Sequence, residues 1–235
     1  MQTKKGSHVG FVISFVLFIT FIVFMYAILN SKVNFGQEKE NSLEYAGGEI
    51  TERVSENMTS ASVTVNNPSS NCVELSNFLG TTGIGNRVIV KSDSGDILDA
   101  GISGQSLQVE RNGNTFFRVY DSEEFIQETD SLSSCQSLSK GSGYTIGLIK
   151  ESTDIFESKI IKLLNNYTAD YETLKKEMKI SQVDEFGFRF IYNNGTEIKT
   201  SERNITTSIY SGRAPIQYIK TDATRESGFM DTIVW

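Results

Sequence analysis

Few residues that carry chemistry occur in this chain of 235 residues. It holds one histidine, His8, two cysteines, Cys72 and Cys135, and two prolines. His8 lies near the N-terminus, and no histidine follows it. The rest of the chain therefore cannot form a Ser-His-Asp triad or a Cys-His pair by itself. Two distant cysteines and one histidine make no zinc ligand set, so we expect no metal and no cofactor.

Charge is absent from one long stretch, Val9–Leu29, which also has no proline. As a helix rising about 1.5 Å per residue it spans roughly 30 Å, the thickness of a bilayer hydrocarbon core. A cleavable secretory signal has a shorter apolar region followed by a small-x-small site, whereas this run ends in Asn30, Ser31 and Lys32. We therefore predict a transmembrane helix over residues 7–31, with residues 9–29 against lipid.

Positive charge precedes this helix, and no acidic residue occurs before Glu38. Lys4, Lys5 and the α-amino group predict a cytoplasmic N-terminus and an extracellular C-terminal part, as a single-pass protein of the cell membrane. Without these two lysines the remaining chain carries −9, against −7 for the whole. An acidic body of this kind disfavours binding to nucleic acid.

Both cysteines fall in the predicted extracellular part. An even count outside the cell favours one disulfide between Cys72 and Cys135. It would close a loop of about sixty residues, worth roughly 4 kcal/mol in chain-entropy terms. Two buried free thiols are the alternative.

Four zones follow along the chain: a basic tail over residues 1–6, the membrane helix over 7–31, a stalk over 32–60 and a body over 61–235. Leu43, Ile50, Val54 and Met58 have helical spacing in the stalk. Gly47-Gly48 weakens that helix by about 1–2 kcal/mol. We expect a partly helical stalk that leads into a strand near Ala61.

The body consists mostly of short apolar runs separated by turn signals. Strands are predicted at residues 63–65, 87–91, 107–110, 116–120, 144–149, 155–163, 186–192, 196–200, 205–210, 216–219 and 229–235. Asn112-Gly113 predicts a hairpin between the third and fourth of these runs, and Asn193-Asn194-Gly195 predicts another. One helix is expected over Ala169–Lys179. The predicted fold class is mainly β: a transmembrane helix followed by a β-sandwich-like extracellular domain with one short helix.

No motif points to catalysis, and we expect a non-enzyme with no catalytic residues. Glu123-Glu124 and Asp184-Glu185 leave a carboxylate mechanism open, although adjacent carboxylates in an acidic domain are usually solvated. The glycine-rich run Gly80–Gly85 lacks the lysine and the following helix of a phosphate-binding loop.

Four N-glycosylation sequons begin at Asn57, Asn166, Asn194 and Asn204. Serine and threonine are so frequent that about three sequons are expected by chance. Asn194, at a predicted hairpin tip, is the best candidate.

The apolar residues of the membrane helix include a heptad-like row, Phe11, Phe15, Phe18, Ile22 and Met25, which allows self-association through this helix.

Lys4-Lys5-Gly6 followed by Ser7 and an apolar helix resembles the class III signal of type IV pilins and archaellins. The resemblance implies cleavage after Gly6, with Ser7 as the first mature residue, and a helix that assembles. Many pilins carry glutamate at the fifth mature position, where this chain has Phe11.

The whole chain also resembles uncharacterised single-pass membrane proteins of small, uncultivated archaea. This resemblance rests on Ser7-His8-Val9, Gly143–Ile149, Ile155–Ile160 and the ending Ser227–Trp235. The resemblance implies a membrane location but no biochemical activity, because none is established for that group.

The first functional expectation is therefore a membrane-anchored cell-surface protein whose non-catalytic body has a structural or binding role in the cell envelope, with an envelope protein as a candidate partner. The second is a pilin-like subunit cleaved after Gly6. A membrane-anchored extracellular hydrolase is a distant third.

Overall fold

The computed structural model describes residues 7–126, 130–201, 203 and 208–235, except for the side chains of residues 7–9 and 29–36. Its helices are α1 (Ser7–Val54), α2 (Phe78–Thr82), α3 (Glu157–Ala169) and α4 (Tyr171–Glu177). Its strands are β1 (Ser55–Val65), β2 (Cys72–Leu75), β3 (Val88–Ser92), β4 (Ile97–Leu98), β5 (Ala100–Ser103), β6 (Ser106–Glu110), β7 (Phe116–Asp121), β8 (Gln136–Leu138), β9 (Tyr144–Phe156), β10 (Phe186–Tyr192), β11 (Glu197–Lys199), β12 (Tyr210–Ile219) and β13 (Arg225–Val234).

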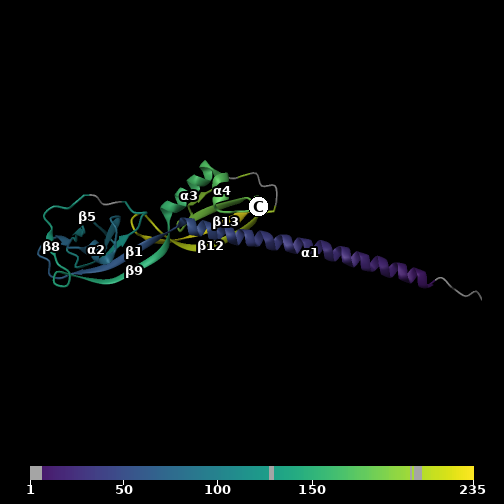
Figure 1. The fold of residues 1–235 in the computed structure, drawn as a ribbon, viewed down its shortest axis with the longest axis horizontal. Coiled ribbons are helices and arrows are strands. Elements are labelled where there is room, and N and C mark those ends of the chain that lie inside the picture. The colour runs from purple at the N-terminus through teal and green to yellow at the C-terminus, as the bar shows by residue number, and fades with distance from the viewer. Residues whose placement is uncertain (1–6, 127–129, 202, 204–207) are drawn as a thin grey trace, which may run out of the picture.

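Helix α1 begins as a free rod and ends inside the folded body (Figure 1). Its segment Gly10–Ile28 has 19 residues and a mean hydropathy of 2.7, so it is long and apolar enough to cross a membrane. None of this segment is buried against the rest of the chain. The expected apolar N-terminal helix is confirmed.

The structure differs from the partly helical stalk expected over residues 32–60. The helix continues through Gly47-Gly48, and β1 follows it directly at Ser55 rather than near Ala61. Ile50 and Val54 are fully buried. Burying a side chain of this size contributes about 1.5–3 kcal/mol, which exceeds the cost of about 1 kcal/mol for each glycine in a helix.

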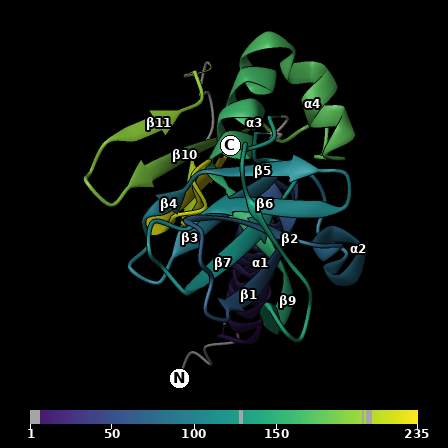
Figure 2. The same cartoon turned by 90° about the vertical axis from the view of Figure 1, so that its left-hand side faces the viewer.

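Two sheets form the framework of the body, and strands outweigh helices, so a mainly β fold is confirmed. The larger has the order β11-β10-β13-β12-β9-β1-β7-β3-β4, and the smaller has the order β5-β6-β2-β8. The pairs β9–β12 and β2–β8 are parallel, and the other pairs are antiparallel. Viewed along the long axis, β5 and β6 lie in front of β7 and β1 (Figure 2).

The body has two lobes joined by the long strands β1 and β9 (Figure 1). We call residues 157–201, 203 and 208–235 the proximal lobe, on which residues 37–54 of α1 pack, and residues 66–126 and 130–143 the distal lobe. Side chains from both sheets share the core around the distal lobe, among them Val63, Leu107 and Phe117. In the proximal lobe, α1, α3 and α4 pack on strands β10, β12 and β13 around a second core.

Two predictions about the helices of the body were wrong. Residues 155–163 were expected as a strand, but α3 begins at Glu157 and buries Ile160, Leu163 and Tyr167, which have the spacing of one helix face. With α2, α3 and α4, the body has three helices among its described residues where one was expected over 169–179.

The hairpin predicted around Asn112-Gly113 was also wrong: this turn connects β6 in the smaller sheet to β7 in the larger sheet. Strand β6 pairs with β2 and β5, whereas β7 pairs with β1 and β3. Leu107 and Phe117 point into the same core from opposite sides, so the turn carries the chain across that core. The hairpin around Asn194 is confirmed, because β10 and β11 are antiparallel neighbours. Residues 205–207 of the expected strand 205–210 lie outside the described residues.

Candidate assembly surface

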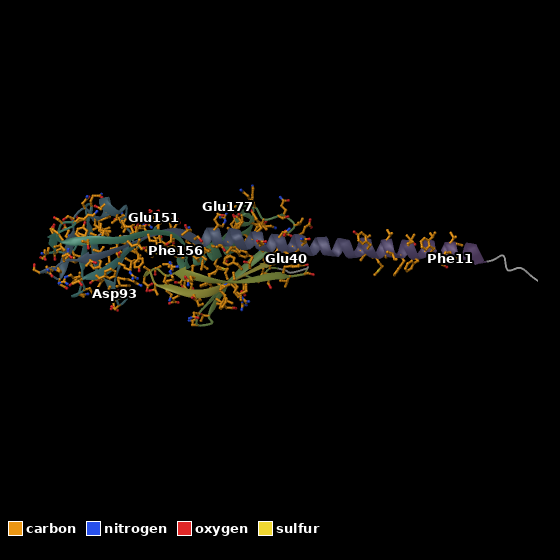
Figure 3. The ribbon with its side chains drawn as sticks, turned by 90° about the horizontal axis from the view of Figure 1, so that it is seen from below. Phe11, Glu40, Asp93, Glu151, Phe156 and Glu177 are labelled. Atoms are coloured by element: carbon orange, nitrogen blue, oxygen red, sulfur yellow. A yellow bond between two sulfur atoms is a disulfide. The ribbon has the colours of Figure 1, made fainter. Side chains whose placement is uncertain are left out.

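The free segment of α1 displays a continuous apolar surface (Figure 3, where Phe11 projects from it). The exposed fractions along the heptad-like row are 72% for Phe11, 57% for Phe15, 58% for Phe18, 45% for Ile22 and 42% for Met25. Exposing so much apolar surface to water costs free energy, so we expect lipid or other protein to cover this segment.

A buried ion pair fixes the second half of α1 to the proximal lobe. Lys39 Nζ lies 2.6 Å from Asp184 Oδ1, and the two side chains are 9% and 8% exposed. Ser42 Oγ donates a hydrogen bond of 2.7 Å to the other carboxylate oxygen of Asp184. Burial of Asp184 opposes its ionisation, but the hydrogen bonds and charge of its partners outweigh burial and lower its pKa.

Further contacts continue along the helix. The Tyr45 hydroxyl donates to the Met178 carbonyl oxygen at 3.1 Å, and Arg53 lies 3.3 Å from Glu177. Between them, Ile50 is buried in the core of the proximal lobe. The direction of α1 is therefore fixed relative to the body, and the free apolar segment continues a helix that the body holds.

The predicted disulfide between Cys72 and Cys135 is confirmed. Cys72 opens β2 and Cys135 directly precedes β8, and these strands are parallel neighbours, with Val73 opposite Gln136. The bond therefore ties two strands of the smaller sheet together.

The predicted processing site is only half visible: Gly6 lies outside the described residues, and Ser7 is the first residue of α1. Among the sequons, Asn57 is exposed on β1, Asn166 on α3 and Asn194 in the turn between β10 and β11. Asn204 lies outside the described residues.

The adjacent carboxylates flagged by the sequence make contacts that hold elements together. Glu185 accepts hydrogen bonds from the Tyr171 hydroxyl and from Lys175 Nζ, and these contacts lower its pKa against the opposing effect of burial. Glu124 accepts from Ser158 at 2.7 Å. Among the described residues, no group of three or more His, Cys, Asp and Glu could hold a metal ion.

Sequence reasoning missed the joint between α1 and the proximal lobe. Lys39 and Asp184 are 145 positions apart, and each resembles a solvated surface charge in its local sequence. The only local signal is the apolar spacing of Leu43, Ile50 and Val54, which marks the buried side of the same helix.

No protein-family model, curated protein or solved structure matches this chain.

Proposed function

We propose that this chain is a membrane-inserted subunit that is cleaved after Gly6 and then assembles with copies of itself through the apolar segment of α1, in the manner of type IV pilins. Its acidic, disulfide-bonded body would stand outside the cell, with a non-catalytic role. The observation that carries the proposal is the single helix that runs from the apolar segment into the core of the body.

A tether needs no fixed joint, because a flexible linker also keeps a domain at a membrane. Here Lys39, Ile50 and Arg53 fix the helix to the proximal lobe. Any packing of one apolar segment against another would therefore set the positions of the bodies. A repeating assembly requires such a fixed relation between the packing of the helices and the positions of the bodies.

The apolar segment also needs a cover once it leaves the bilayer. Segment Gly10–Ile28 is exposed along its whole length. Helices of neighbouring copies supply such a cover, and the row that begins at Phe11 gives large side chains for that packing.

The lysines before the helix favour a cytoplasmic N-terminus, and the disulfide fits an oxidising exterior. An uncleaved anchor whose body binds or spaces another envelope component is the second candidate. Phe11 favours it, since many pilins carry glutamate at that position of the mature chain.

The test is to replace Gly6 by valine in the native host and to shear the cells. Gly10→Ala is the matched control, because an added Cβ at Gly10 meets nothing within 4 Å. We expect wild type and Gly10→Ala to release high-mass polymer, and Gly6→Val to stay in the membrane at full length. Polymer from Gly6→Val, or from none of the three, would contradict the proposal.

A further inference from the structure

Helix α1 carries two adjacent glycines where it packs on the body. Glycine weakens a helix, because it loses more backbone freedom on folding than other residues do. Neither Gly47 nor Gly48 has a positive φ, so the backbone conformation does not require glycine here. A Cβ added at Gly48 would meet nothing within 4 Å, and one at Gly47 would meet Thr232 Oγ1 at 3.5 Å. The backbone of α1 is therefore open to close approach by another chain.

The two glycines line a groove of about 770 Å³ between α1 and strands β12 and β13. Ala214 on β12 lies opposite Met230 on β13, so both belong to one face of the sheet, and Met230 is part of the core under α1. Ala214 is exposed on that same face. Helices therefore leave part of the face of β12 uncovered, and Leu43 and Ile216 add further apolar surface to the groove.

The shape of this groove fits a second helix that lies beside α1. The lining residues of α1 recur every three or four positions from Glu40 to Glu52, which is one face of the helix, and they extend over roughly 18 Å. Packed helices lie about 8–10 Å apart, and small residues such as Gly47 and Gly48 allow the closest approach. The uncovered face of β12 gives such a helix a sheet to pack on.

Negative charge surrounds the groove. Glu40, Glu44 and Glu52 line it. The lining includes one cation, Arg213, and its guanidinium group lies 2.7 Å from the carboxylate of Asp231. The groove therefore suits an apolar helix that has no acidic residue and carries a positive charge.

We propose that the groove of one copy receives the first part of the apolar segment of a second copy, a contact that rests on the cleavage and assembly proposed above. Segment Gly10–Ile28 is exposed along its whole length and needs a cover. No acidic residue precedes Glu38 in the chain. Cleavage after Gly6 leaves the α-amino group of Ser7 as a positive charge at the start of the helix.

The direction and position of the docked helix follow from these features. The two helices run in the same direction, because every copy enters the membrane with the same orientation. Phe11 is 72% exposed and fills the space that Gly47-Gly48 leave open. Ser7, about one turn earlier in the same helix, then brings its α-amino group between Glu40 and Glu44.

This contact requires one copy to be displaced outward. Residues 11 and 47 lie about 54 Å apart along a helix, which exceeds the hydrocarbon thickness of about 30 Å. Figure 3 shows Phe11 on the free rod and Glu40 where the rod enters the body. Copies at one level in a membrane therefore cannot make the contact. Each displaced copy still offers its own groove, so the contact repeats without closing.

The first test links two copies by disulfides in the full chain. Phe11→Cys with Gly48→Cys should give a ladder of disulfide-linked multimers when sheared polymer is oxidised, and each single variant should give none. The matched control joins Phe11→Cys to Tyr45→Cys, since Tyr45 is 43% exposed and lies within a turn of Gly48 but does not line the groove. Copies held in the membrane by Gly6→Val should give no ladder, because residues 11 and 48 then stay about 55 Å apart.

The second test blocks the groove without changing the apolar segment. Gly48→Leu puts a large side chain into the space for Phe11, and we expect about tenfold less polymer, because overpacking weakens a contact by at least this factor. Gln37→Leu, at an exposed position of α1 before the groove, is the matched control and should leave the amount of polymer within about twofold. Urea unfolding should show both variants to be at least about as stable as wild type, since leucine favours a helix.

The outcomes separate this contact from the proposed function. Polymer of Ser7-initiated chains without a ladder from Phe11→Cys with Gly48→Cys would overturn the contact and leave helix assembly standing. Full assembly of Gly48→Leu, an equal ladder from the Tyr45→Cys control, or a link from Gly48→Cys to a different protein would do the same. Uncleaved chains that never polymerise would overturn both.

Discussion

Replacing Asp184 by asparagine removes the negative charge that holds Lys39 against the proximal lobe. Both side chains are less than a tenth exposed, and their charged atoms lie 2.6 Å apart. Removing one member of a buried ion pair leaves the other charge without its counter-ion, which typically costs about 3–5 kcal/mol. We expect Asp184→Asn to lower the free energy of unfolding of the body by that amount at pH 7.

The assay is urea unfolding of the full chain in detergent, followed by tryptophan fluorescence. Trp235 is the only tryptophan, it is 7% exposed, and its backbone bonds to that of Glu185 beside the ion pair. The double variant Lys39→Met with Asp184→Leu is the control. It should lie within about 1–2 kcal/mol of wild type, because replacing a whole buried pair by apolar groups is often neutral.

The difference in the free energy of unfolding between wild type and Asp184→Asn should depend on pH in a definite direction. The folded pKa of Asp184 lies below its ordinary value of 3.8. The ion pair therefore contributes its full stability above pH 3.8, the ordinary pKa of the carboxyl group. This contribution is lost as the pH falls through the lower pKa that Asp184 has in the folded protein. The deficit of Asp184→Asn should stay constant from about pH 7 to 5 and shrink below about pH 4. A deficit under about 1 kcal/mol at pH 7, the value of an exposed pair, would refute the reasoning.

Further variants test the rest of the chain. Gly48→Ala should raise stability by about 0.5–1 kcal/mol, since its added Cβ meets nothing within 4 Å, and a loss in urea unfolding would contradict the continuous helix. Ile50→Ala should cost about 2–5 kcal/mol in the same assay, and a cost below about 1 kcal/mol would argue against its burial in the core. Cys72→Ser with Cys135→Ser should cost roughly 4 kcal/mol, and the wild-type thiols should resist labelling until reduced. Asn194→Gln should lower the mass of material from native membranes by one glycan, and an unchanged mass would exclude that site.

Local patterns predicted the features that depend on local sequence. The apolar helix follows from an uncharged run, and the turn around Asn194 follows from its glycine. The disulfide follows from an even cysteine count, and its partners were unambiguous because the chain has only two cysteines.

Features decided by tertiary contacts were missed. Helix α1 continues through Gly47-Gly48 because residues beside the two glycines, such as Ala46 and Ile50, are buried against β12 and β13. These strands lie more than 150 positions away in the sequence. Residues 157–163 have β-branched character but become helical, since Ile160 and Leu163 face that same core. Asn112-Gly113 marks a turn and contains nothing that tells a hairpin from a crossing between sheets.

The position of β9 in the larger sheet was also beyond local reasoning. Its exposed Leu148 and Ile149 read as ordinary strand residues, and only the sheet order reveals that, among the described strands, none pairs with residues 145–154 on the side away from β1.

The intact mass of the chain isolated from native membranes and from sheared polymer tests the central proposal most directly. The account predicts a chain that begins at Ser7 in the polymer, because cleavage after Gly6 precedes assembly. A chain that still carries Lys4 and Lys5 in every fraction would contradict it and would leave α1 as an uncleaved membrane anchor.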